Sequence, residues 1–260
     1  MSMHLPLSVL LLVRDETRDV EELLPQLAFA AEVVVVWDPR GDRATREAAE
    51  RLGARVFERE FAGFGAQRAF ALAQCTQPWV LWLDADERLT PESVPTLERA
   101  IATGAGRPLM LLAHRSTWFL GRRIRWCGWR GEWLVRFFAR EPARFDDALV
   151  HERVHVPGAT VLTGLGPFEL EHHSYRTWDS CVDKMLRYSR ANADQAYRAG
   201  RRAGPADVLF RPGLRFLRQY VLQRGFLDGA HGLVLCGFAS AQVFLKYARL
   251  WWLSERGGVE

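Results

Sequence analysis

The stretch "WVLWLDADERL", residues 79–89, determines how the rest of the chain is interpreted. Its apolar residues 80–83 run directly into Asp84, Asp86 and Glu87. A continuous apolar run of this length predicts a strand that is buried on both faces of a sheet. Three carboxylates within four residues at the end of such a strand indicate either a solvated turn or a site for a cation.

Strand-like and helical patterns alternate around this stretch. Apolar runs predict strands at 7–13, 32–37, 55–57 and 79–83, and helical spacing predicts helices at 19–27, 43–52, 63–75 and after 90. We expect a capping box at Asp19, an N-cap at Thr90 and a helix stop at Gly53. Alternation with short connections predicts an α/β fold whose mostly parallel sheet carries helices on both faces.

Acidic residues follow three of the predicted strands. Asp15 and Glu16 come after the first strand, Asp38 after the second, and Asp84 and Asp86 after the fourth. Because ligands of parallel sheets bind beyond the carboxyl ends of the strands, these side chains are expected on one edge. A solvated turn does not predict this convergence. The pair Asp84 and Asp86 suits Mg²⁺ or Mn²⁺, which take carboxylates together with substrate phosphates.

The composition is that of an ordinary folded protein. The 260 residues are 48% hydrophobic, with a net charge of +4. The four cysteines form no C-x-x-C pair, so a reducing cytoplasm is expected. The first apolar run lacks a basic segment before it and a cleavage site after it, and we expect a strand there instead of a signal peptide. Residues 198–224 hold seven arginines and one acid, which favours an anionic partner.

Helical character returns after Tyr175. An apolar stripe and a basic stripe lie side by side in the pattern: Phe210, Leu214, Leu217 and Val221, then Arg211, Arg215 and Arg218. Residues 232–253 are about long enough to span a bilayer, but Lys246 and Arg249 interrupt them. An amphipathic helix in the membrane interface, with Trp251 and Trp252 at headgroup level, and a buried C-terminal helix both remain open.

The segment "HERVH", residues 151–155, matches the zinc-protease signature H-E-x-x-H. That chemistry needs a helix, so that both histidines reach one zinc ion. The valines around it, followed by Pro157 and Gly158, predict a strand and a turn instead. A zinc metalloprotease therefore remains only as an alternative of a different class, and Glu152 remains an acid flanked by histidines.

Two further interpretations are less favoured. In "GFGAQR", residues 63–68, Arg68 takes the place of the third glycine of a dinucleotide fingerprint, which leaves Arg68 as a candidate phosphate contact. An arginine-rich nucleic-acid binder is ranked last, because the aromatic residues cluster at 118–138, away from the arginines. No nucleic-acid partner is expected.

In these features the chain resembles the family 2 nucleotide-sugar glycosyltransferases of the GT-A fold, and most of all the branch of lipopolysaccharide-core β-glucosyltransferases. The resemblance rests on segments in the family's order: "LSVLLLVRDETRDVEELL", "EVVVVWDPRGDRAT", "GFGAQRAFALAQCTQPWVLWLDADERLTPE", "STWFLGRRIRWCGW", "LVRFF", "ALVHERV", "HHSY" and "RGFLDGAHGL". It implies a Rossmann-like, mostly parallel sheet with helices on both faces and a C-terminal helical extension.

The resemblance also implies roles for individual residues. Nucleotide-sugar binding falls to Asp15, Glu16, Asp38, Arg68, Asp84 and Arg136. Metal binding falls to Asp86 as the direct ligand, with Asp84 beside it and His172 or His173 closing the site. Catalysis falls to Glu152 as the general base, with Asp147 and its neighbour Asp146 as the next candidates.

The implied enzyme is an inverting, Mg²⁺- or Mn²⁺-dependent hexosyltransferase. It would move a sugar from a nucleotide diphosphate sugar, with a UDP-hexose expected, to a saccharide or lipid-linked acceptor of lipopolysaccharide core or a related cell-envelope glycan. Transfer to a polyprenyl phosphate is the alternative. We expect a catalytic domain at 1–175, with a nucleotide-sugar half at about 1–105 and an acceptor half at about 106–175, and a membrane-associating region at 176–260. The expected location is cytoplasmic, peripherally associated with the inner membrane.

Overall fold

The chain divides into two compact units in the computed structural model, which describes residues 4–104, 107–146 and 154–257. The sheet unit comprises Met1–Arg115 and Glu132–His172, and the helical unit comprises Ser116–Gly131 and His173–Glu260. The helical unit therefore takes a short segment from the middle of the chain as well as the C-terminal third.

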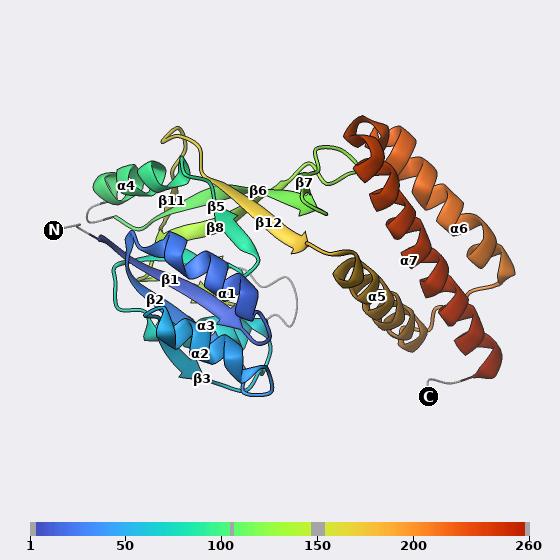
Figure 1. Cartoon of the computed structure of the whole chain (residues 1–260), viewed down its shortest axis with the longest axis horizontal. Helices are drawn as coiled ribbons and strands as arrows, with labels where there is room; N and C mark the ends of the chain where they lie inside the picture. The colour runs from blue at the N-terminus through green and yellow to red at the C-terminus, as the bar shows by residue number, and fades with distance from the viewer. Residues whose placement is uncertain (1–3, 105–106, 147–153, 258–260) are drawn as a thin grey trace. The chain divides into compact units, whose positions relative to one another are not determined.

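The chain forms a ten-stranded sheet, most of which belongs to the sheet unit, while one short strand and the ends of two others belong to the helical unit (Figure 1). Its strands are β1 Leu5–Val13, β2 Ala30–Trp37, β3 Arg55–Glu58, β4 Trp79–Trp82, β5 Glu87–Leu89, β6 Leu109–Phe119, β7 Arg122–Arg123, β8 Glu132–Ala139, β11 Thr160–Val161 and β12 Glu169–Tyr175. The order is β3-β2-β1-β4-β8-β6-β12-β5, with β7 and β11 also pairing with β6. Strands β1 to β4 pair in parallel, whereas β8 is antiparallel to β4 and β6. Two short strands, β9 Arg144–Phe145 and β10 Val154–His155, form a separate antiparallel pair.

Helices cover both faces of this sheet. They are α1 Thr17–Leu23 with a 3₁₀ turn η1 Leu24–Leu27, α2 Arg43–Arg51, α3 Phe64–Gln74 and α4 Ser93–Thr103. Alternate residues of β1 enter different cores: Val9 packs in the core that includes α1, α2 and α4, and Leu10 packs in the core that includes α3. Burial on both faces explains the uninterrupted apolar runs of β1, β2 and β4. The predicted fold class is confirmed.

Two predicted helix starts are wrong. Helix α1 begins at Thr17, after Glu16, so Asp19 lies in its first turn and forms no capping box. Its carboxylate instead accepts a hydrogen bond from Arg88 Nη2 at 3.2 Å. Helix α4 begins at Ser93, and Thr90 is not its N-cap. The cause is β5, which the sequence did not predict and which keeps the chain extended up to Leu89.

The helical unit contains three long helices. They are α5 Trp178–Arg198, α6 Pro205–Leu217 and α7 Gly229–Arg256, with a π-helical turn η2 Arg218–Leu222 and a 3₁₀ turn η3 Gly225–Asp228 between α6 and α7. Helices α6 and α7 form an antiparallel hairpin (Figure 1). By length and composition Gly225–Arg256 is able to cross a membrane, but the core helix of a soluble protein passes the same test. Only 17% of its most apolar window is buried.

Candidate active site

The loops after β1, β2 and β4 meet at the carboxyl edge of the parallel strands. Asp38 N donates to Val13 O at 3.0 Å, directly beyond the paired ends of β1 and β2. Asp42 N donates to Asp15 Oδ1 at 2.8 Å, which joins the first two loops. Because β4 pairs with β1 in parallel, the loop that carries Asp84 opens on the same edge.

Asp84 is held by two arginines and one backbone contact. Its Oδ1 accepts from Arg68 Nη2 at 3.1 Å, and its Oδ2 accepts from Arg136 Nη2 at 2.8 Å. Its backbone N–H donates to Glu87 Oε2 at 3.0 Å. Arg136 Nη2 also donates to Glu87 Oε1 at 2.6 Å. The loop after β4 is therefore closed by these four side chains, which we call the Asp84 network, and Arg115 Nη1 adds an ion pair to Glu87 Oε1 at 3.2 Å.

The Asp84 network is buried against Trp82. The guanidinium carbons of Arg68 and Arg136 lie 4.0 and 4.4 Å from the centroid of the Trp82 ring. The side chains of Arg136 and Glu87 are 2% and 0% exposed. In the described part of the chain, Nε and Nη1 of Arg136 have no hydrogen-bond partner. The indole face partly compensates this loss through a cation–π interaction.

Opposite charges decide the ionisation of Asp84. Burial opposes its charged form, but Arg136 and Arg68 outweigh burial and hold the pKa of Asp84 below its usual range. Burial lowers the pKa of Arg68 to about 10, although Asp84 opposes the change, so Arg68 stays cationic at neutral pH. Asp84 is thus an anion whose two oxygens each accept from an arginine.

Asp86 lies beside His172. Its Oδ2 lies 3.3 Å from His172 Nε2, with 25% and 19% of the two side chains exposed. The antiparallel pairing of β5 with β12 places His172 opposite Glu87 and so brings it to this loop. The next residue, His173, stacks on Trp118 at 5.2 Å between ring centroids, within the helical unit.

The pair Asp86 and His172 fits a divalent ion. Neighbouring ligands of an octahedral ion with bonds of about 2.0–2.1 Å are about 3 Å apart, close to the observed separation. Both side chains are partly open, which leaves room for oxygens from a ligand. In residues 4–104, 107–146 and 154–257, no group of three His, Cys, Asp or Glu side chains forms a complete metal site. An ion here would take its remaining ligands from phosphates or water.

The carboxylate of Asp38 is hydrogen-bonded to Arg40, two residues later in the same turn. The buried carboxylate accepts from Arg40 Nε at 3.0 Å and from Arg40 Nη2 at 2.7 Å. These bonds, more than any other contact, hold the pKa of Asp38 below its usual range. The Arg40 side chain is 51% exposed. Arg40 was not among the site residues predicted from the sequence, although its spacing of two residues from Asp38 is a local signal.

The two acids after β1 differ in direction. Asp15 is exposed, with Oδ1 bound to Asp42 N. Glu16 turns back on the chain, and its Oε2 accepts from the backbone N–H groups of Arg14 and Asp15 at 2.6 and 3.0 Å. Burial raises the pKa of Glu16 in spite of these bonds. Asp15 is the more accessible of the two for a ligand.

Two predicted catalytic residues, Glu152 and Asp147, lie outside the described residues. Their neighbour Asp146 lies 3.6 Å from His155, between Oδ2 and Nε2. Val154–His155 forms strand β10. This conformation disagrees with the helix that the zinc-protease signature requires.

Comparisons with known proteins show what this chain is similar to. Residues 18–140 match the model of Glycosyl transferase family 2. The chain is 27% identical to the lipopolysaccharide core biosynthesis glycosyltransferase LpsC of Rhizobium meliloti, over 94% of each protein. Among solved structures it is similar to S. aureus TarS 1–349 in complex with UDP-GlcNAc, at 14% identity and a TM-score of 0.46, over 98% of this chain and 92% of that one. Glucosyl-3-phosphoglycerate synthase from Mycobacterium tuberculosis, in complex with Mn²⁺ and UDP, is 24% identical at a TM-score of 0.34, over 44% of each chain.

Proposed function

Because residues 18–140 match the model of Glycosyl transferase family 2 and the chain forms a mostly parallel sheet covered by helices, we propose that this chain is a metal-dependent, inverting glycosyltransferase with a GT-A fold. It transfers a hexose from a nucleotide diphosphate sugar, UDP-linked, to a saccharide or lipid-linked acceptor. The observation that carries the proposal is the pair Asp86 and His172, 3.3 Å apart beside the Asp84 network.

Asp86 and His172 are the residues that would hold Mg²⁺ or Mn²⁺. The ion would supply Lewis-acid stabilisation of the diphosphate that leaves the sugar. A cation is needed there because the sheet unit contains 24 of the 31 Asp and Glu residues and only 17 of the 35 Lys and Arg residues. The unit therefore attracts a diphosphate poorly by itself.

The remaining donor contacts fall to residues of the same edge. Asp84 and the arginines Arg68 and Arg136 position the loop that carries Asp86. Asp38 binds the base, and Asp15 and Glu16 line the base and ribose pocket. For Asp38 to accept a hydrogen bond from the base, the exposed side chain of Arg40 swings away, and its guanidinium becomes available to the donor's phosphates.

Proton removal falls to Glu152, with Asp147 as the next candidate. A carboxylate within hydrogen-bond reach of the acceptor hydroxyl takes its proton as the hydroxyl attacks. A single displacement on an α-linked donor then gives a β-linkage. A correctly folded Glu152→Gln variant that keeps full turnover would exclude this residue as the base.

The acceptor and the location follow from the rest of the chain. Residues 1–175 form the catalytic domain, with donor and acceptor halves that meet near 105, and residues 176–260 bind the cytoplasmic face of the inner membrane. The similarity to a lipopolysaccharide core glycosyltransferase supports an acceptor in cell-envelope glycan synthesis. Many large apolar side chains of the helical unit are exposed, which supports contact with a membrane surface. The alternative acceptor is a polyprenyl phosphate.

A panel of nucleotide sugars, assayed for Mn²⁺-dependent transfer or hydrolysis, tests the proposal. The metal supplies several kcal/mol of transition-state stabilisation, so Asp86→Ala should lower kcat/KM by about 10³-fold. A chelator should have a similar effect on the wild type. Glu141→Ala is the matched control, because this carboxylate belongs to the same unit and is 82% exposed. Wild-type turnover by a folded Asp86→Ala variant would contradict the proposal.

A further inference from the structure

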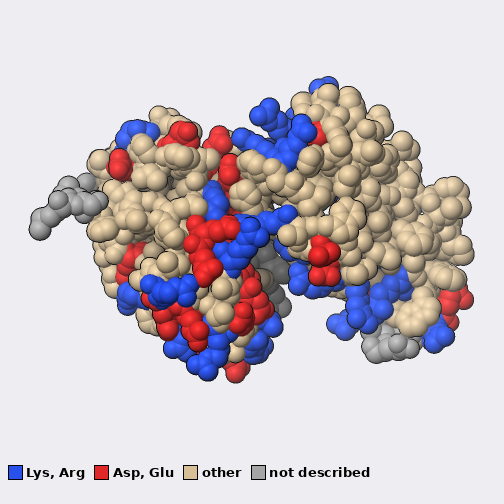
Figure 2. Space-filling view, in the orientation of Figure 1, with Lys and Arg blue, Asp and Glu red and all other residues tan. Residues whose placement is uncertain are grey.

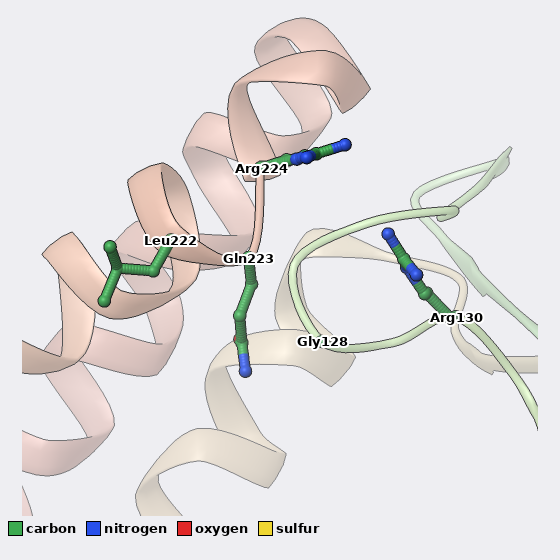
Figure 3. A pocket seen from close by; sticks show the side chains of 5 residues that line it. All are labelled: Gly128, Arg130, Leu222, Gln223 and Arg224. Atoms are coloured by element: carbon green, nitrogen blue, oxygen red, sulfur yellow. The ribbon is translucent and has the colours of Figure 1, made fainter.

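The helical unit contains an open cavity of its own. Gly128, Arg130, Leu222, Gln223 and Arg224 line it (Figure 3), and its volume is about 610 Å³. Volumes of this size are common for ligand sites. The lining comes from two segments far apart in the sequence, the loop after β7 and the turn between η2 and η3. We call this cavity the arginine corner.

A buried carboxylate fixes the loop that forms one wall of the arginine corner. Asp228 is 4% exposed, and its carboxylate accepts from the backbone N–H groups of Arg125 at 3.1 Å and Trp126 at 2.8 Å. Cys127 N donates to Gln223 O at 3.2 Å in the opposite wall. These hydrogen bonds fix the two walls relative to each other, so the shape of the cavity is determined by the fold of this unit.

The walls approach each other closely at Gly128. Its φ is +76°, a region that favours glycine, and an added Cβ would lie 2.5 Å from Gln223 Oε1. In Figure 3 the side chain of Gln223 extends toward the loop at Gly128. A side chain at position 128 would displace the amide group of Gln223 from this place.

Both walls present an arginine, and one indole ring connects them. The guanidinium carbons of Arg130 and Arg224 lie 4.6 and 5.8 Å from the centroid of the Trp126 ring. Both arginines are exposed, and neither forms an ion pair with any carboxylate that the structure describes. Two cations near each other without a counterion favour an anion, and the planar fork of arginine suits phosphate.

Apolar side chains surround the arginine corner. Leu222, Phe226 and Leu227 are 78%, 48% and 49% exposed. In Figure 2 the surface over α6 and α7 is mostly uncharged, with Lys and Arg near the ends of the helices. A ligand with an anionic head and an apolar remainder satisfies both parts of this surface.

We propose that Arg130 and Arg224 form a binding site for the phosphate of an anionic membrane lipid. None of its residues is assigned to the donor, and the proposal rests on the part of the proposed function that brings the helical unit to a membrane. Each arginine would donate charge-assisted hydrogen bonds to the phosphate, while Leu222 and Phe226 contact the acyl region.

Vesicle binding by the full-length protein tests this site. The probes are vesicles of phosphatidylcholine with and without phosphatidic acid, and the variant is Arg130→Gln/Arg224→Gln. The matched control, Arg198→Gln/Arg201→Gln, removes the same charge from two exposed residues, at the end of α5 and in the loop before α6. The control measures the loss caused by general electrostatics. The corner variant should lose about tenfold more affinity for phosphatidic-acid vesicles, because charge-assisted hydrogen bonds are also lost.

Three results would overturn the site. Equal losses in the two variants would reduce the effect to general electrostatics. Saturable binding of inorganic phosphate that disappears in the corner variant, with unchanged vesicle binding, would identify a soluble ligand instead of a lipid. Absence of vesicle binding by the wild type would remove the lipid site and the membrane contact together. The donor assay, run without vesicles, reports separately on the proposed catalysis.

Discussion

The sheet unit and the helical unit differ in the sign of their charged residues and in how deeply these residues are buried. The sheet unit is acidic, and several of its charged side chains are buried in ion pairs such as the Asp84 network. The helical unit holds 18 of the 35 Lys and Arg residues and 7 of the 31 Asp and Glu residues, with its arginines largely at the surface. A phosphate ligand therefore meets an excess of carboxylates in the first unit and an excess of arginines in the second.

The units also differ in where their apolar side chains lie. Leu7, Leu10 and Leu81 of the sheet are fully buried, whereas Leu209 and Leu222 of the helical unit are 71% and 78% exposed. Large exposed apolar patches mark surfaces for a partner or a membrane. Buried charge in one unit and exposed apolar surface in the other are thus the two properties to test.

The largest expected effect tests buried charge in the sheet unit. Arg136→Met removes the partner of Asp84 and Glu87 while it keeps most of the side-chain volume. Removing one member of a buried ion pair typically costs 3–5 kcal/mol, so the free energy of unfolding should fall by about that amount. Urea unfolding, monitored by circular dichroism, measures the change.

The matched control lies in the helical unit. Arg249 Nε lies 2.7 Å from Asp194 Oδ1, but the two side chains are 22% and 20% exposed. Because this pair is more exposed than Arg136 and Glu87, Arg249→Met should cost less than Arg136→Met, about 1–2 kcal/mol. Equal costs for the two variants would mean that the units do not differ in how much their stability depends on buried ion pairs.

The second effect concerns Glu32, which ties β2 to its neighbours. Burial opposes its ionisation, but hydrogen bonds from Ser8, Thr76 and Arg55 outweigh burial and lower the pKa of Glu32 to about 2. The depressed pKa means that its stabilisation is complete above pH ~4.5, the unfolded value, and is lost as the pH falls toward 2. Glu32→Gln should cost about 1–2 kcal/mol at pH 7 because solvent screens part of the interaction, and the difference should shrink as the pH falls toward 2.

A carboxylate of the helical unit provides the contrast. The backbone N–H of Gly204 and the guanidinium of Arg211 also hold the pKa of Asp207 below its usual range, but this carboxylate lies at the surface. Asp207→Asn should change the pH dependence of unfolding much less than Glu32→Gln. Unfolding titrations of both variants between pH 2 and 7 make the comparison, and similar profiles would contradict it.

The sequence predicted the parallel half of the sheet because that half is built from local signals. Apolar runs at β1, β2 and β4 reflect burial on both faces, and Gly53 ends α2 with a φ of +84°. Strand β5 was missed because Glu87 and Arg88 make it look like a polar loop. Both side chains are buried by partners far away in the sequence: Arg115 and Arg136 for Glu87, and Asp19 and Glu22 for Arg88.

In the candidate site, too, local features could be predicted from the sequence, and contacts between distant segments could not. Alternation along a strand predicts that His172 and His173 face opposite ways, but only the register of β12 against β5 identifies His172 as the neighbour of Asp86. The bond between Arg40 and Asp38 is local and was open to prediction. The packing of Arg68 and Arg136 on Trp82 could not be predicted from the sequence. These two arginines come from α3 and β8 and meet only in the folded unit.

The smallest expected change in the free energy of unfolding is that of Leu214→Ala, which tests the exposed apolar surface. Leu81 in β4 is fully buried and Leu214 in α6 is 64% exposed. Leu81→Ala should cost about 2–5 kcal/mol through lost burial and a cavity, whereas Leu214→Ala should change the free energy of unfolding by no more than about 0.5 kcal/mol. The same Leu214 substitution should weaken binding to vesicles, because it removes apolar area that the chain itself does not cover. A cost for Leu214→Ala near that of Leu81→Ala, without any change in vesicle binding, would show that the surface over α6 is packed in solution and that the two units bury their apolar side chains alike.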